Sequence, residues 1–222
     1  MDVLPKKISG SPIYVRIFPF AIFLLLTLAQ DSFGEAPRYW FYLAKTICGA
    51  LAIWAVRPFV PEMRWACSVE AVVVGAAIFA LWVGLDPLYG KISKTHAPWN
   101  PNFHFGEGSA LSSVFIAVRI VGSTFVVPPL EEVLYRSFLY RYMASPDFER
   151  VPLGKFLPVP FFGTALIFGF SHREWLAGIL CACAYQWLVL RKNRLGDAMT
   201  AHAITNFLLG TWVIWRGAWN FW

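Results

Sequence analysis

Residues 12–30 read PIYVRIFPFAIFLLLTLAQ, an apolar run with one charged side chain, Arg16. A helix that crosses a bilayer needs about 20 predominantly apolar residues, and this run has that length. Basic residues precede it, as in a signal peptide, but no clean A-x-A cleavage site follows and further apolar runs do. We therefore expect residues 12–30 to be a retained first membrane helix.

The rest of the chain contains a series of similar apolar runs. They lie at 39–56, 66–85, 109–127, 129–144, 157–172, 174–190 and 197–215. The shorter runs at 129–144 and 157–172 are expected to be tilted, kinked or partly interfacial. The sequence therefore predicts an all-α, polytopic membrane bundle of about seven or eight helices.

Composition agrees with a membrane location. The 222 residues are 58% hydrophobic and only 14% charged, whereas soluble domains carry about 25% charged residues. No linker, charge block or repeat divides the chain, so we expect one integral membrane domain over residues 1–222. The net charge of +6 is scattered between apolar runs, which indicates contact with the lipid bilayer and not with nucleic acid.

Basic residues recur in alternate connecting segments and predict the orientation. These segments carry Lys6 and Lys7, Arg57 and Arg64, Arg141, Arg150 and Lys155, and Arg191, Lys192 and Arg194. Positive charge favours the cytoplasmic side, so the N-terminus is expected inside. The opposing segment 31–38, with Asp31 and Glu35 against one arginine, agrees. The aromatic, proline-rich loop 86–107 is expected to cap the outer face.

Two groups of residues that often carry chemistry are expected to be structural here. His96 and His104 lie in loop 86–107, where histidines are usually solvated or structural. The four cysteines lie in or beside apolar runs without a C-x-x-C pair, which indicates helix packing and not a disulfide or metal framework. They are Cys48, Cys67, Cys181 and Cys183.

Charged residues gather in PPLEEVLYRSF, residues 128–138, between apolar runs. Ionisable groups at membrane depth indicate function, although an interfacial loop with solvated charges is the alternative. The two prolines predict a helix start, which would place both glutamates in the first turn, where the helix dipole favours negative charge. Glu132 and Arg136 are spaced to form an i,i+4 pair. Glu131 points about 100° away around the helix and stays free to accept a proton.

Two further polar pairs lie on later apolar runs. Phe168 and His172 in FGFSH, and His202 and Asn206 in HAITN, are each spaced i,i+4 and share a helix face. Either histidine alone would more often be a satisfied buried residue. Polar groups on three apolar helices are costly unless they meet, so the sequence predicts that they converge.

Such a group suits the activation of water. A carboxylate beside an imidazole can take a proton from water and later return it, while a second imidazole and an amide can stabilise an oxyanion. The expected target is a carbonyl, most plausibly that of a peptide bond. No G-x-S-x-G or H-E-x-x-H motif occurs, although a zinc site formed by Glu131, His172 and His202 stays open.

The motifs E-E-x-x-x-R at 131–136, F-x-x-x-H at 168–172 and H-x-x-x-N at 202–206 resemble the CPBP family. That family comprises the CAAX prenyl proteases of the second type and bacteriocin-processing (Abi) proteins, and the resemblance covers about residues 109–212. The compact size and a tryptophan-rich loop are also similar to bacterial relatives found with exosortase-type sorting systems. This resemblance implies a multi-pass protein of the bacterial inner membrane.

The resemblance implies an intramembrane endopeptidase that needs no metal or other cofactor and acts on a peptide or protein. Glu131 would be the general base, with His172 helping to activate the water. His202 and Asn206 would form the oxyanion hole, and the second glutamate and the arginine of the first motif would support the site. Ser137 stands where the family often has glycine after that arginine.

Two alternatives keep the same residues: a zinc peptidase, and a non-catalytic membrane scaffold or immunity protein that binds a partner peptide. A transporter is less favoured, because most other helices lack a polar path. The predicted spans place His172 near one membrane face and His202 nearer the other. The two histidines can therefore meet only if one helix is short, kinked or deeply set.

Overall fold

The computed structural model describes residues 4–30, 32–92 and 98–222 and contains helices and connecting segments, with no strand in these ranges. Its α-helices are α1 (Lys6–Ser9), α2 (Pro12–Gln30), α3 (Glu35–Val56), α4 (Val69–Leu85), α5 (Pro101–Phe105), α6 (Ala110–Val121), α7 (Val127–Glu132), α8 (Tyr140–Tyr142), α9 (Pro158–Phe170), α10 (Trp175–Lys192) and α11 (Gly196–Arg216). The predicted all-α bundle is confirmed. Asp31 and His96, used above, lie outside the described residues.

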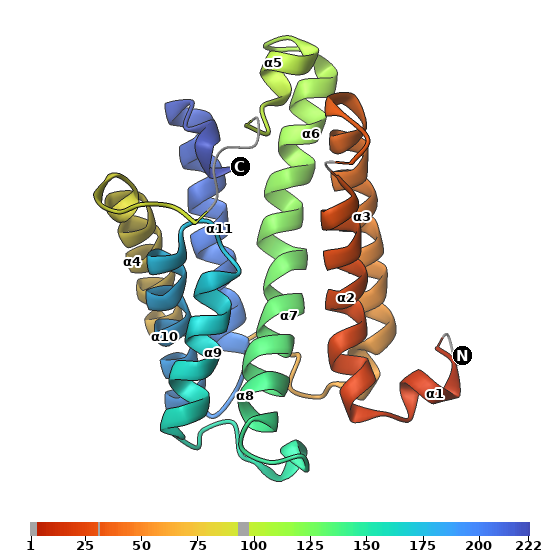
Figure 1. The fold of residues 1–222 in the computed structure, drawn as a ribbon, viewed down its shortest axis with the longest axis vertical. Helices are drawn as coiled ribbons and strands as arrows, with labels where there is room; N and C mark the ends of the chain where they lie inside the picture. Colours follow the sequence, from red (N-terminus) through yellow and green to blue (C-terminus); the bar gives the residue numbers. More distant parts are fainter. Residues whose placement is uncertain (1–3, 31, 93–97) are drawn as a thin grey trace.

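Within these ranges, four helices are long and apolar enough to cross a membrane. They are Pro12–Gln30, Glu35–Phe59, Val69–Leu88 and Ala110–Tyr142. The last of these is a continuous rod, in which π-helical turns at Gly122–Val126 and Val133–Leu139 connect α6, α7 and α8. It runs through the middle of the molecule in Figure 1.

The predicted break between residues 127 and 129 is therefore wrong, as is the helix start at Pro128 and Pro129. Proline cannot donate a backbone hydrogen bond and collides with the carbonyl one turn earlier, which normally breaks a helix. The wider π-helical turn directly before these prolines changes that spacing and lets the helix continue. The two glutamates consequently lie in the interior of a long helix, so the expected help from a helix dipole is absent.

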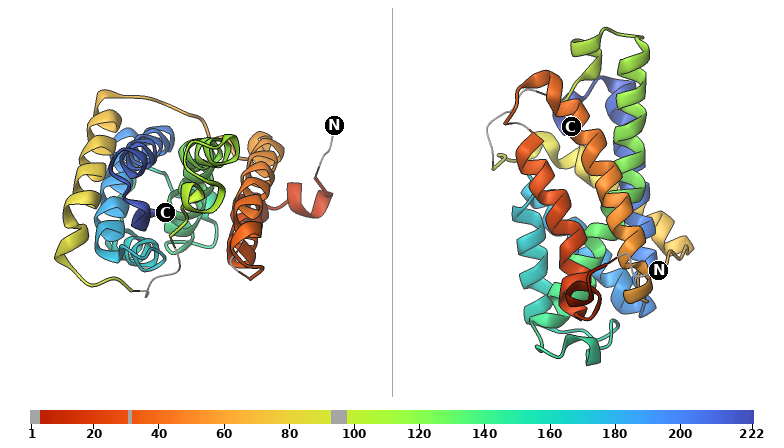
Figure 2. Two further views of the ribbon diagram at one scale, coloured as in Figure 1. Left: turned by 90° about the horizontal axis from the view of Figure 1, so that it is seen from above. Right: turned by 90° about the vertical axis from the view of Figure 1, so that its right-hand side faces the viewer.

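The central rod separates two groups of helices. In Figures 1 and 2, α2 and α3 lie on one side, and α4, α9, α10 and α11 lie on the other. The larger buried core lies mainly in the second group, where Tyr185, Leu188 and Met199 are completely buried, and it extends to the rod and to α2 and α3. Helices approach closely where glycine replaces a side chain: a Cβ atom on Gly75 of α4 would lie 2.6 Å from the Ala201 carbonyl oxygen of α11.

The two ends of the bundle differ in character. The four basic segments lie together at the lower end in Figure 1, with α1 and the 143–157 connection. At the other end, Trp99 is 1% exposed and packs on Tyr39 and Tyr42, so part of loop 86–107 covers this end. The ring of His104 stacks on Tyr39 at 5.2 Å, which is a structural contact.

Candidate active site

Glu132 is the most deeply buried acid of the first motif, with no exposed surface. Its Oε1 lies 2.9 Å from Nδ1 of His202, and its Oε2 lies 3.3 Å from Nε of Arg136. The spacing of the motif predicted the contact with Arg136. The contact with His202 was not predicted, because it depends on where α11 packs.

Glu131 has a different environment from its neighbour. Its Oε2 lies 3.9 Å from Nε2 of His202, and this buried oxygen has no hydrogen-bond partner among the residues that the structure describes. The two glutamates therefore face opposite nitrogens of one imidazole. When Nδ1 of His202 donates to Glu132, Nε2 is the atom left to face Glu131.

His172 lies in the turn that follows α9. Because α9 is short, ending at Phe170, this turn lies partway along the central rod and not at the end of the bundle (Figure 1). Nδ1 of His172 lies 2.7 Å from the Phe168 carbonyl oxygen. In the described part of the chain, no hydrogen bond or ion pair joins His172 to either glutamate of the motif.

The ring of Phe168 lies close to the rings of both histidines. Its centroid lies 4.4 Å from the ring of His172 and 6.5 Å from that of His202. The guanidinium of Arg136 lies over the same ring at 4.5 Å. All three sequence motifs therefore meet around one aromatic side chain, which is itself buried.

Asn206 lies one turn beyond His202 on α11. Its Nδ2 donates to the Ser123 carbonyl oxygen at 2.8 Å, in the first π-helical turn of the rod. The two residues line a hollow of about 220 Å³. A side-chain amide has two N–H donors, so the bond to Ser123 leaves the second for another acceptor.

Three residues that carry no sequence signal, Tyr135, Tyr185 and Thr205, also surround the two histidines. The ring of Tyr185 stacks on His202 at 5.3 Å, and its hydroxyl donates to Thr205 at 2.7 Å. The Tyr135 hydroxyl donates to Ser171, beside His172, at 3.4 Å. Tyrosines and a threonine in apolar helices form no recognisable sequence pattern, so only three-dimensional packing shows that these residues belong to the site.

A metal site was the alternative left open above. Across the ranges that the structure describes, no three His, Cys, Asp or Glu side chains are grouped closely enough to hold a metal ion. The four cysteines carry free thiols.

The fold and this site together define a helical membrane protein with a buried acid–imidazole group, a class that includes intramembrane proteases. Residues 112–208 match the family model described as type II CAAX prenyl endopeptidase Rce1-like. This region contains all three motifs, and the match supports the CAAX prenyl protease (CPBP) family that the motifs indicated. Comparisons with curated proteins and with solved structures gave no match.

The family match supports a CAAX-protease-type intramembrane endopeptidase, which implies a peptide or protein substrate. The apolar helices are consistent with a location in the lipid bilayer. The match does not distinguish the exosortase-associated subset from other members of the family.

Proposed function

We propose that this chain hydrolyses a peptide bond within the membrane, with Glu131 as the general base and no bound metal. The observation that carries the proposal is the unequal environment of the two adjacent glutamates. Oε1 of Glu132 shares a 2.9 Å hydrogen bond with Nδ1 of His202, and its Oε2 pairs with Arg136 at 3.3 Å. Among the described residues no hydrogen bond reaches Glu131, whose buried Oε2 lies 3.9 Å from Nε2 of His202. Water at that oxygen would have an acceptor for its proton.

In the proposed reaction, Glu131 takes a proton from water, and the water oxygen attacks the carbonyl carbon of the substrate. Nδ1 of His172 donates to the Phe168 carbonyl, which leaves Nε2 as an acceptor that can orient the same water. Glu131 then gives the proton to the leaving amine as the C–N bond breaks. The glutamate is regenerated, so protons and electrons balance.

The proposed oxyanion hole consists of His202 and Asn206. In this proposal both ring nitrogens of His202 carry a proton, so that Nδ1 donates to the Glu132 carboxylate 2.9 Å away and Nε2 donates to the oxyanion. Asn206 contributes the N–H that Ser123 does not use. Donors of this kind are typically worth about 3–4 kcal/mol in the transition state.

Several broader assignments belong to the same proposal. The chain would form one integral domain, with the catalytic region at about 109–212, and cross a bacterial inner membrane several times. Lipid-modified C-termini are the substrates that the family name suggests, and a sorting tail is the bacterial alternative. Fold and family alone do not identify which of them this chain cleaves.

Substrate trapping with Glu131→Gln tests the proposal. The variant should remain folded, retain its substrate and release no product, and mass spectrometry of the co-purifying material identifies the peptide. The wild-type protein should then cleave that peptide. If Glu131→Gln instead loses partner binding or unfolds, the polar group is a structural clasp, and the scaffold alternative replaces the enzyme.

The zinc alternative is tested on the purified wild-type protein. A metal-free mechanism predicts no stoichiometric zinc and full activity in a strong chelator. Stoichiometric zinc together with cleavage that the chelator abolishes would overturn it.

A further inference from the structure

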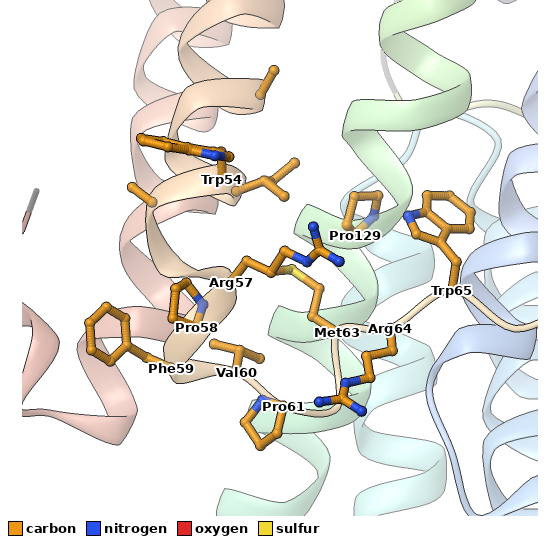
Figure 3. Close-up of a pocket in the computed structure, with 13 residues that line it drawn as sticks. Trp54, Arg57, Pro58, Phe59, Val60, Pro61, Met63, Arg64, Trp65 and Pro129 are labelled. Carbon is orange, nitrogen blue, oxygen red and sulfur yellow. The ribbon is translucent and has the colours of Figure 1, made fainter. Parts of the chain in front are cut away.

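A large hollow lies at the lower end of α3, apart from the glutamates. Its volume is about 1210 Å³, and its walls are the last turns of α3, the connecting segment 57–65 and one proline of α7 (Figure 3). The lining combines aliphatic, proline and tryptophan side chains with two arginines, Arg57 and Arg64. An apolar hollow with cationic groups at one end suits an amphiphile with an anionic head.

The α3 wall forms an apolar track that ends in a cation. Ala50, Ile53, Trp54 and Arg57 all line the hollow, and their spacing places them on one face of the helix. Because α3 belongs to a candidate membrane span that ends at Phe59, the track leads from membrane depth toward an interface. Trp54 is 61% exposed, which is typical of tryptophans at a membrane–water boundary.

Arg57 and Arg64 provide the charge. Both are exposed, and within the described residues neither side chain forms a hydrogen bond or an ion pair. In Figure 3, Arg57 extends from the end of α3 toward Pro129 and Trp65, and Arg64 lies beyond Met63. Two guanidinium groups beside one hollow favour an oxyanion such as a phosphate.

The acid between these arginines does not neutralise them. Glu62 faces the interior, where its Oε1 lies 2.9 Å from Nε of Arg16 and 3.0 Å from Nη2 of Arg141. The acidic side chain of the segment is therefore already paired, and it leaves the positive charge of Arg57 and Arg64 at the hollow unneutralised.

The same contacts hold the segment in place. Beyond the bonds of Glu62, the Thr200 hydroxyl of α11 donates to the Ala66 carbonyl at 2.9 Å. Gly196 lets α11 begin directly against the segment, since a Cβ atom there would lie 2.2 Å from the Arg64 carbonyl oxygen. Because the backbone that carries both arginines is fixed, little ordering is needed when a ligand binds.

We propose that this hollow binds one acidic phospholipid, with the phosphate between Arg57 and Arg64 and an acyl chain along the α3 track. The depth of the track favours a bilayer lipid over a soluble anion, and an anionic bilayer surface attracts arginines at this position. The site is independent of the proposed peptidase chemistry. It adjoins the catalytic helix, because Pro129 lines the hollow two residues before Glu131.

Native mass spectrometry of the full-length protein in detergent tests the site, with phosphatidylglycerol and phosphatidylcholine as probes. The wild-type protein should bind one phosphatidylglycerol in preference to phosphatidylcholine. Arg57→Gln and Arg64→Gln should each weaken that binding about fivefold, and the double variant about thirtyfold. Arg150→Gln is the matched control, because Arg150 lies at the same end, is 87% exposed and pairs with Asp147; it should change nothing.

Three results would overturn the proposal. The first is equal phosphatidylglycerol affinity in the wild-type protein and the double variant. The second is displacement of the lipid by soluble glycerol phosphate at comparable concentration, which would indicate an anion site without a lipid. The third is normal lipid binding by the double variant together with lost affinity for a lipidated peptide, which would assign the hollow to the substrate.

Discussion

Glu131 and Glu132 are neighbours in the chain but face different surroundings. Successive helical residues point about 100° apart, which is why the spacing alone predicted that Glu132 pairs with Arg136. It did not predict that Glu132 also bonds His202, because no local pattern specifies how α11 packs. The assignment of catalytic roles to these residues stays a prediction.

Replacing Glu132 with glutamine should mainly affect stability. The substitution leaves Arg136, which is 2% exposed, without a charge partner. Breaking a buried pair in this way costs about 3–5 kcal/mol, so thermal unfolding in detergent should occur at a clearly lower temperature. Glu107→Gln is the control at an exposed acid. Equal unfolding temperatures for Glu132→Gln and the wild-type protein would show that the pair does not stabilise the fold.

Replacing Asn206 with alanine should mainly affect turnover. Loss of one oxyanion donor typically lowers kcat about 10²–10³-fold, while KM should change little because the donor acts in the transition state. Steady-state cleavage kinetics measure both constants. Thr211→Val is the control on the same helix, since among the described residues the Thr211 hydroxyl bonds only the Phe207 carbonyl. A raised KM with unchanged kcat would remove Asn206 from the oxyanion hole.

At the scale of elements, apolar runs predicted the helices well and the joins between them poorly. The double proline was interpreted as a helix start, whereas the π-helical turn before it lets the rod continue from Ala110 to Tyr142. A π-helical turn has no sequence signal comparable to proline. We expected His172 and His202 to meet only if one helix is short, kinked or deeply set. Helix α9 is short and ends at Phe170, just before His172.

The packing of α9 on α10 should set the position of His172. A Cβ atom on Gly169 would lie 2.3 Å from Ile179 and 2.8 Å from the Trp175 carbonyl oxygen. Gly169→Ala should therefore push the two helices apart, lower stability by about 1–3 kcal/mol and reduce kcat. Unfolding temperature and cleavage rate are the two measurements.

Gly84→Ala is the control for this substitution, because nothing lies within 4 Å of a Cβ atom there. Gly84 lies in the last turn of α4, and alanine is favoured over glycine in helices by up to about 1 kcal/mol, so this variant should be as stable as the wild-type protein or slightly more so. If Gly169→Ala behaves in the same way, close packing at Gly169 does not position His172.

At the scale of the whole molecule, Glu62 connects elements that are distant in sequence. It contacts Arg16 of α2 and Arg141 of α8, and Arg16 also pairs with Glu149 of the 143–157 connection. Burial alone would raise the pKa of the Glu62 carboxyl, but hydrogen bonds from Arg16 and Ser137 hold it below its usual value of 4.5. No motif marked Glu62, because its ion pairs with Arg16 and Arg141 join residues distant in sequence.

This lowered pKa predicts how stability depends on pH. Because Glu62 binds protons less readily in the folded state, its ionised form stabilises the fold above about pH 4.5. The contribution is lost as the pH falls through the folded-state pKa. Glu62→Gln should therefore unfold at a lower temperature than the wild-type protein at pH 7, and the difference should shrink below pH 4.5. A difference that stays constant down to pH 3 would contradict this assignment.

The proposed hydrolysis of a peptide bond depends on Glu131 acting as the base. Its most direct test is cleavage of the trapped peptide in proteoliposomes by the wild-type protein and by Glu131→Gln, with thermal unfolding measured on both. If Glu131 is the base, the two proteins should have equal unfolding temperatures and equal peptide binding, and the variant should cleave about 10²–10⁴-fold more slowly. Cleavage by folded Glu131→Gln at the wild-type rate would contradict it.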